Sequence, residues 1–479
     1  ASNVASTGTF GHCANCHAPG IDGENVGARD LQDAEGWSHD YGVHCDVCHR
    51  VESVDMESFI PGVGGRLKIL RPSDPPKFAA LGVFAPLTFG PNPDVGNVYM
   101  GSVQREHFRQ SEFCSGCHEQ HQEVLLPGVS IDTSRWPSGR LPIHTTYSEW
   151  KDSPIAAALT CQGCHMPAFG PEILNGADLQ NAAPEQTGIV AGWIRPAGET
   201  RSHVSLGPRA SAQGRAMLNG SVAISDLSTS ADGDELLVSV EMANVAGSHA
   251  VPTGEPMRSL VLRIDVSCDS GTATAVGGHA VPDFSGAYEH KESNQDWTEW
   301  TNPQVGQVIR VIKRTGEYHD YLGYGPFGDG TFNATQKGMP VEEVVGMSTI
   351  LSVAGSAVTL DVPLPEGDRA YLVDGGGVPI EGEAVRHQAG APGFAFARVL
   401  TGPLGERMVP HFMAVDVASD NRLMPGGTYT TTHRFQLGDC VNPSATAVIT
   451  YRAYPPSLAL QRGWGHKEWV LKTVSIGVP

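Results

Sequence analysis

The chain has 479 residues, with 32 Lys and Arg against 52 Asp and Glu, and a formal net charge of −20. Hydrophobic residues make up 40% of it, which is enough for buried cores and excludes wholesale disorder. The acidic balance argues against nucleic-acid binding, because a phosphate backbone requires a basic face. No apolar run approaches the roughly 18 residues of a membrane-spanning helix, so no transmembrane segment is expected.

One five-residue pattern, C-x-x-C-H, occurs four times near the start of the chain, at Cys13–His17, Cys45–His49, Cys114–His118 and Cys161–His165. This is the attachment signature of c-type haem. Each thiol adds to one vinyl group of the porphyrin, and the His after the second Cys ligates the iron from the proximal side. The sequence therefore predicts four haem c groups. Their covalent attachment sites are Cys13, Cys16, Cys45, Cys48, Cys114, Cys117, Cys161 and Cys164, and their proximal ligands are His17, His49, His118 and His165.

Two other uses of paired cysteines fit less well. Zinc would combine two C-x-x-C units into one four-thiolate site, and it has no use for a His after every pair. A redox-active dithiol is typically a single motif in a βαβ context. Four pairs out of four followed by His favour covalent haem.

The chemistry also predicts the compartment. Haem c is attached outside the cytoplasmic membrane, so a periplasmic or extracellular protein is expected, with a signal peptide already removed before Ala1. Cys268 and Cys440 remain outside the motifs and lie in strand-like sequence. An oxidising compartment favours a disulfide between them, and two free buried thiols are the alternative.

The composition divides the chain into two predicted domains. Residues 1–205 hold every motif and are rich in Gly, Pro and His, with short helices expected at Val103–Ser115 and Tyr147–Leu159. Such a loop-rich region can be stable because the apolar faces of the haems replace a side-chain core. We expect a tetrahaem cytochrome domain here.

Residues 206–479 are predicted to form an all-β antiparallel sandwich of the Greek-key kind. Apolar runs with alternating patterning are separated by Gly, Pro, Asn or Asp, and no helical pattern alternates with them. A long aromatic-rich insertion is expected near 278–340, either packed on the sheet or used as a contact surface for a partner. The runs are Leu236–Met242, Leu260–Val266, Val305–Ile312, Met347–Leu360, Phe394–Leu400, Thr428–Phe435 and Ala445–Tyr451.

Four irons with two imidazole ligands each need four distal histidines, and 15 of the 19 His lie outside the motifs. His12 and His44 each directly precede a motif, so they cannot easily reach their own iron but can reach that of a neighbouring haem. His107 lies on a predicted helix two turns before Cys114, facing another haem. Each candidate could equally be a propionate partner or a surface histidine. The distal candidates are His12, His44, His107 and His203, with His39, His121, His144 and His249 as alternates.

Several stretches resemble secreted multihaem c-type cytochromes, and are broadly similar to the cytochrome c-554-like group. They are Gly42–His49, Ser111–His118, Thr146–Trp150 and Cys161–Pro167, and Asn244–Gly254 resembles a Gly-His-x-x-Pro-Thr-Gly signature of β domains that follow such regions. In this chain a Ser separates that Gly from His249. The resemblance implies electron transfer through closely stacked haems, and it supports His44, His203 and His249 as ligands. It also leaves assembly through the β domain, including into filaments, as an expectation.

The sequence is compatible with three different functions. The first is an electron carrier, whose acidic surface would suit redox partners with basic docking faces. The second is a redox enzyme that acts on a small nitrogen or sulfur compound at a haem with an open distal side. The third is an adhesion or assembly protein that works through its β domain. No motif for a hydrolase, a zinc protease or a phosphate loop is present, and no catalytic residue is predicted.

Overall fold

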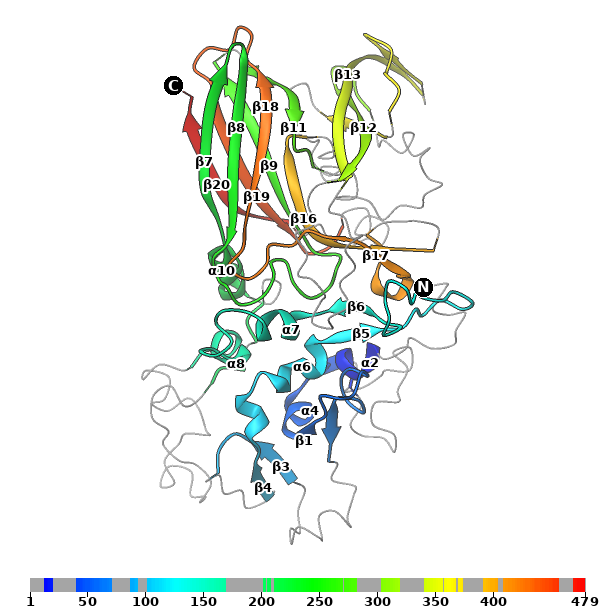
Figure 1. The fold of residues 1–479 in the computed structure, drawn as a ribbon, viewed down its shortest axis with the longest axis vertical. Helices are drawn as coiled ribbons and strands as arrows, with labels where there is room; N and C mark the ends of the chain where they lie inside the picture. Colours follow the sequence, from blue (N-terminus) through cyan, green and yellow to red (C-terminus); the bar gives the residue numbers. More distant parts are fainter. Residues whose placement is uncertain are drawn as a thin grey trace. The chain divides into compact units, whose positions relative to one another are not determined.

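The chain forms two compact units in the computed structural model (Figure 1). The first, here called the motif unit, comprises Ala1–Pro127, His144–Lys151 and Ile155–Arg215. The second, the β unit, comprises Gly128–Ile143, Asp152–Pro154 and Ala216–Pro479. The structure describes residues 13–19, 40–70, 87–93, 101–168, 201–203, 205–207, 211–269, 271–281, 303–318, 340–355, 357–367, 369–373, 391–403, 408–455 and 468–478.

Helices and strands in the motif unit are short. A small antiparallel pair joins β1 to β2, and β3 runs parallel to β4. The elements are α2 (Cys13–His17), α4 (Cys45–His49), β1 (Val51–Val54), β2 (Leu67–Ile69), β3 (Leu87–Gly90), β4 (Gly101–Gln104), η2 (Glu106–Arg109), α6 (Glu112–His118), β5 (Gln120–Gln122), α7 (Thr146–Lys151) and α8 (Cys161–His165). β6 (Leu141–His144) and α10 (Ala212–Ser221) each span a boundary between the units.

Both helices predicted between the motifs are wrong in extent. The stretch Val103–Ser115 is not one helix, because it passes from β4 through η2 to α6. Val103 packs against the small cluster of Leu70 and Phe89, and Gln110 has an extended backbone that separates η2 from α6. The helix predicted at Tyr147–Leu159 ends at Lys151, and Pro154 explains the stop because it lacks an N–H and disfavours helical geometry before it.

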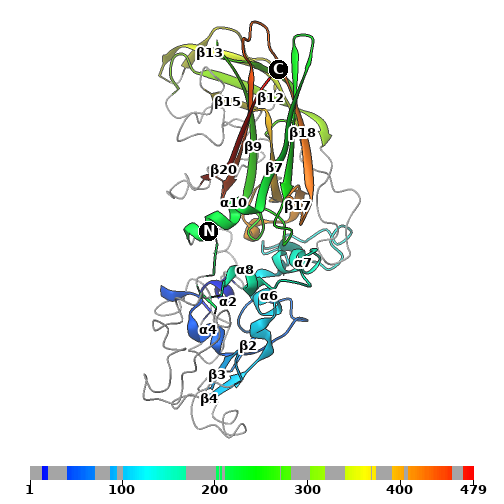
Figure 2. The ribbon, with the colours of Figure 1, turned by 90° about the vertical axis from the view of Figure 1, so that its left-hand side faces the viewer.

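The β unit contains two antiparallel sheets that share one core (Figure 2). One sheet has the order β17-β16-β9-β19-β20, with β10 on β9, and the other has the order β11-β18-β8-β7. The strands are β7 (Val222–Asp232), β8 (Glu235–Asn244), β9 (Ser259–Cys268), β10 (Gly271–Thr272), β11 (Thr274–Gly278), β16 (Gly393–Thr401), β17 (Asp416–Asp420), β18 (Thr428–Gln436), β19 (Ser444–Arg452) and β20 (Glu468–Gly477). A short η7 (His411–Met413) precedes β17.

Alternating residues of these strands build the core. Leu236, Val238, Val240 and Met242 of β8 are fully buried, and every second residue of β9 and β19 faces the same cluster. This is the period of two that a half-buried strand requires. Five of the predicted runs lie within single strands, Val305–Ile312 enters β12 only at Val308, and Met347–Leu360 spans two strands with a turn between them.

A third antiparallel sheet has the order β14-β13-β12-β15. Its strands are β12 (Val308–Tyr318), β13 (Pro340–Ala354), β14 (Ala357–Leu360) and β15 (Arg369–Val373). The insertion predicted near 278–340 contains β12, which overlaps the strand-like run predicted at Val305–Ile312. Residues 282–302 and 319–339, with the aromatic residues Trp297, Trp300, Tyr321, Tyr324 and Phe327, lie outside the described residues.

Gly128–Ile143 belongs to the β unit although it lies between the third and fourth motifs. Trp136, Leu141 and Ile143 are buried in a cluster with Val409 and Val417. The indole N–H of Trp136 donates to Asp416 Oδ1 at 2.8 Å, and Arg135 forms an ion pair with the same carboxylate. Hydrophobic burial and a charged bond thus hold this segment in the β unit.

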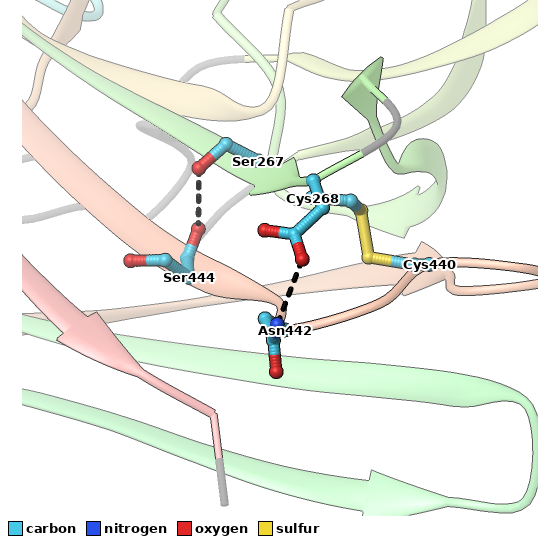
Figure 3. Close-up of a disulfide and its surroundings, with 6 residues drawn as sticks. Ser267, Cys268, Cys440, Asn442 and Ser444 are labelled. Atoms are coloured by element: carbon cyan, nitrogen blue, oxygen red, sulfur yellow. Dashed lines mark hydrogen bonds between the residues drawn. A yellow bond between two sulfur atoms is a disulfide. The ribbon is translucent and has the colours of Figure 1, made fainter.

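A disulfide bond joins Cys268, at the end of β9, to Cys440, in the loop after β18 (Figure 3). Their Cα atoms lie 5.2 Å apart. Beside it, the amide of Asn442 donates to Asp269 Oδ2 at 2.7 Å, and Asp269 N donates to the carbonyl of Val441 at 2.9 Å. The bond fixes the loop to the strand with which β19 pairs.

Among the described residues, no helix is both long and apolar enough to span a membrane.

Candidate functional site

Each C-x-x-C-H motif forms one short helix. Three of these helices, α2, α4 and α8, begin at the first Cys and end at the His, and α6 contains the third motif at its end. Positions i, i+3 and i+4 of a helix share one face. Both thiols and the imidazole of each motif therefore lie on the same face, which is the arrangement that covalent attachment to one porphyrin requires.

The four motif helices converge within the motif unit (Figure 1). The thiol of Cys117 donates a hydrogen bond to Cys16 of the first motif, and the thiol of Cys114 donates to Cys161 of the fourth. Cys48 of the second motif lies close enough to Cys117 to feel its charge. The third motif is thus hydrogen-bonded to the first and fourth motifs, and Cys117 also packs against the hydrophobic cluster that contains Val47 of the second motif.

Hydrogen bonds between thiols and burial together shift the pKa values of four of these cysteines. Desolvation, with smaller contributions from Cys117 and Cys45, raises the pKa of the Cys48 thiol to about 11. The hydrogen bond between Cys114 and Cys161 raises the pKa of the donor Cys114, and it lowers that of the acceptor Cys161 to about 7. The raised pKa values of Cys48, Cys114 and Cys117 favour the neutral thiol at these three positions, which does not suit a thiolate metal site.

The loop before β2 holds the first and third motifs together through backbone bonds. Gly62 N donates to the carbonyl of Gly116 at 2.6 Å, and Val63 N donates to that of Asn15 at 3.0 Å. Gly62 has φ +73°, and a Cβ there would lie 2.3 Å from the Asn15 oxygen. Glycine is therefore required for this close approach.

Arg66 fixes the same loop to the third motif. Its Nη1 donates to the carbonyls of Ser115 at 3.2 Å and Glu119 at 3.0 Å, and its Nε donates to that of Ser58 at 2.8 Å. The residue is only 8% exposed. A cation at the end of α6 satisfies carbonyls that the helix itself leaves without partners.

The fourth motif is anchored to the segment that precedes the third. Gln162 Nε2 donates to the carbonyls of Gln110 at 2.7 Å and Phe108 at 3.2 Å. Cys161 N donates to the hydroxyl of Ser111 at 3.0 Å, and Thr160 caps α8 by accepting from Gly163 N at 3.3 Å. These bonds fix the spacing between the third and fourth motifs.

Two of the four motif imidazoles show the hydrogen bond that a metal-binding histidine needs. Nδ1 of His49 donates to the carbonyl of Phe89 at 2.7 Å, and Nδ1 of His165 donates to that of Leu206 at 2.7 Å. A carbonyl can only accept, so each Nδ1 carries the proton and each Nε2 carries the lone pair. A neutral imidazole with Nε2 as its donor atom fits an axial ligand of haem iron. The residues of the second and fourth motifs therefore fit a haem c group.

Two of the distal-ligand candidates, His203 and His107, lie in positions that are compatible with binding a haem iron. The His203 ring lies 6.2 Å from the ring of His49, measured between centroids. Nε2 of His107 is buried and has no hydrogen-bond partner among the described residues, and its ring stacks on Phe108 and Phe113. Burial lowers the pKa of His107, and a hydrogen bond with the backbone of Val51 opposes this only in part. The lowered pKa favours the neutral ring.

The other candidates are more ordinary. His121 Nε2 lies 3.0 Å from Glu119 Oε1, and His249 belongs to the β unit, where its Nδ1 bonds the carbonyl of Ala250. His44 immediately precedes α4, and His144 ends β6. His12 and His39 lie outside the described residues.

Sequence reasoning missed the residues that position the motifs. Arg66 and Gln162 are nearly buried, and both act through backbone carbonyls of distant segments. A buried Glu119 accepts from the backbone and hydroxyl of Ser148 as well. The only signal in the sequence was local, because Gln162 and Glu119 lie within or next to a motif.

No family model matches the chain, and no curated protein matches it either. Among solved structures, the chain is similar to a penta-heme cytochrome c552 from Thermochromatium tepidum. The identity is 16%, the match covers 97% of this chain and 83% of that chain, and the TM-score is 0.48. So distant a likeness carries no argument about this chain.

Proposed function

We propose that this protein is a tetrahaem c-type cytochrome that carries electrons outside the cytoplasm. One observation carries the proposal: four C-x-x-C-H helices lie in one compact unit, where the third motif is hydrogen-bonded to the first and fourth and packs against the cluster that contains Val47 of the second. Unrelated zinc or dithiol sites have no need for four such helices gathered together.

Bound haem c would supply a one-electron redox centre at each motif. The chain holds each centre in place through two thioethers and an imidazole. His49 and His165 are oriented by the carbonyls of Phe89 and Leu206, so neither ring can rotate without losing a hydrogen bond. Contacts between motifs keep the four attachment sites close together, which is what transfer from one centre to the next requires.

The third motif is proposed as the junction of the set. Its cysteines are hydrogen-bonded to Cys16 of the first motif and Cys161 of the fourth, and Cys117 packs against the cluster that contains Val47 of the second. Arg66 and the loop around Gly62 also hold this motif, through its backbone carbonyls. An electron that enters at any motif would then reach the others through the third.

The location and partners follow from chemistry at the surface and in the β unit. The Cys268–Cys440 disulfide supports an oxidising compartment, either periplasmic or extracellular. The net charge of −20, made more negative by haem propionates, favours redox partners with basic faces. Self-association through the β unit is a further part of this proposal, and particle size in solution tests it.

The haem content is the decisive measurement. Protein matured in a host with the haem c attachment machinery should carry four covalent haems, by intact mass and by the pyridine haemochrome spectrum. All four should be low-spin in an electron paramagnetic resonance spectrum at low temperature. Protein whose mass matches the bare chain would overturn the proposal. A high-spin haem that binds carbon monoxide would instead favour the alternative function, a redox enzyme with an open distal site.

A further inference from the structure

The imidazole of His49 has defined neighbours on two sides. Its Nδ1 edge donates to the carbonyl of Phe89 at 2.7 Å. Phe108 stacks on the ring at 5.6 Å between centroids, with an interplanar angle of 18°. The iron-binding Nε2 therefore faces away from Phe89, and any ligand on the far side of a bound iron must come from another segment.

His203 is such a residue. Its ring centroid lies 6.2 Å from that of His49, and the two planes are tilted by 41°. This pair is farther apart and more tilted than the stacked pair of His49 and Phe108. Two imidazoles that bind one metal from opposite sides place their centroids roughly 6 Å apart, since each metal–nitrogen bond is about 2 Å long. The separation thus leaves room for one iron and one macrocycle plane.

Hydrogen bonds to the fourth motif hold the segment that carries His203. Ser202 N donates to the carbonyl of Pro167 at 2.9 Å, and Leu206 N donates to that of His165 at 2.9 Å. These anchors lie on either side of His203 along the chain. The imidazole is thus presented by a fixed segment, while its own side chain remains exposed and accessible to a cofactor.

We infer that His203 is the distal ligand of the iron bound to His49, so that the second haem is bis-imidazole. The inference rests on the proposed function, and it adds a pairing between two particular residues. It also has a structural consequence. The segment that ligates the second haem is hydrogen-bonded to the helix of the fourth, so a displacement of α8 would move an axial ligand of the second motif.

Replacing His203 tests the pairing. The His203→Ala variant should keep four covalent haems, with one quarter of the iron changed from low-spin to high-spin and able to bind carbon monoxide. The His203→Met variant should restore a low-spin state at that haem with a higher reduction potential, because methionine is a weaker donor than imidazole. His411→Gln in the β unit, whose ring contacts Glu255, is the matched control and should leave the spectrum unchanged.

A second background identifies which haem responds. In Cys45→Ser/Cys48→Ser, which cannot attach the second haem, three haems should remain and His203→Ala should produce no high-spin signal. A high-spin signal in that background would overturn the pairing, and so would four low-spin haems in His203→Ala. Absence of any covalent haem would refute the proposed function itself, which is a different result. Should the double Ser variant not accumulate, the methionine–iron absorption band of His203→Met still tests the inference. Its presence would show that residue 203 ligates a haem iron, and its absence would contradict this.

Discussion

Asp420 illustrates how a single buried charge is kept in the β unit. The residue is fully buried, and its carboxylate accepts from Arg398 Nε at 2.8 Å and from Arg422 Nε at 2.8 Å. Burial alone would raise the pKa of Asp420, but Arg422 and Arg398 outweigh it and hold the pKa below its usual range. Arg398 also donates to the carbonyls of Pro142 and Ile143, so the same network binds the segment that enters from between the motifs.

The Asp420→Asn variant should be destabilised by about 3–5 kcal/mol, because it leaves two buried guanidinium groups without their counter-charge. The wild-type carboxylate should also make stability depend on pH. Its folded pKa lies below its unfolded value of about 3.9, so the stabilisation is complete above that value and is lost as pH falls through the folded pKa. Urea unfolding of both proteins between pH 3 and 7 measures this. An equal acid sensitivity in Asp420→Asn would show that other groups are responsible.

At the scale of elements, the packing of α6 on β2 depends on a glycine inside the third motif. A Cβ on Gly116 would lie 2.4 Å from Cδ2 of Leu67, a residue that is itself only 5% exposed. The equivalent glycine of the fourth motif, Gly163, meets nothing closer than 3.7 Å. Two residues at the same position of the same motif therefore face different surroundings.

Gly116→Ala should destabilise the motif unit by about 1–3 kcal/mol, because the cost of overpacking exceeds the helix propensity that alanine gains. Gly163→Ala is the matched control and should be neutral or stabilising. Thermal unfolding followed through the haem absorption compares the two variants. A Gly116→Ala protein as stable as Gly163→Ala would mean that Leu67 moves aside at no cost.

Sequence patterns predicted these elements with uneven success, for physical reasons. The strands Leu236–Met242 and Leu260–Val266 were predictable because both lie in a core that selects alternating apolar residues. β7 and β20 were missed because they are edge strands of their sheets, and much of their length is polar and exposed. The motif helices were implied by the attachment chemistry. The bonds from Arg66 and Gln162 to distant carbonyls were not, because no periodicity in the sequence encodes them.

At the scale of the whole molecule, the disulfide closes a long span of chain. Cys268 and Cys440 are separated by 172 residues, and they link the end of β9 to the loop that leads into β19, the strand that pairs with β9. A cross-link over so many residues restricts the unfolded chain. Its main effect is therefore expected on the stability of the β unit and not on the shape of its sheets.

Cys268→Ser/Cys440→Ser should lower the free energy of unfolding of the β unit by about 2–4 kcal/mol. A mild reductant should have the same effect on the wild type, with no effect on the double variant. The haem spectrum serves as the internal control, because none of the eight motif cysteines is changed. A loss of haem in the double variant would show that the effect is not confined to the β unit.

The path of the chain between the third and fourth motifs has a practical consequence for anyone who wishes to express the haem region alone. A gene fragment that stops after residue 205 would still encode Gly128–Ile143, and with it Trp136, Leu141 and Ile143, whose buried partners Val409 and Val417 would never be translated. Without those partners, the segment Gly128–Ile143 would expose an apolar surface, which favours aggregation. A usable minimal fragment would need a short flexible bridge in place of those residues, and the two units are therefore better regarded as interleaved than as consecutive.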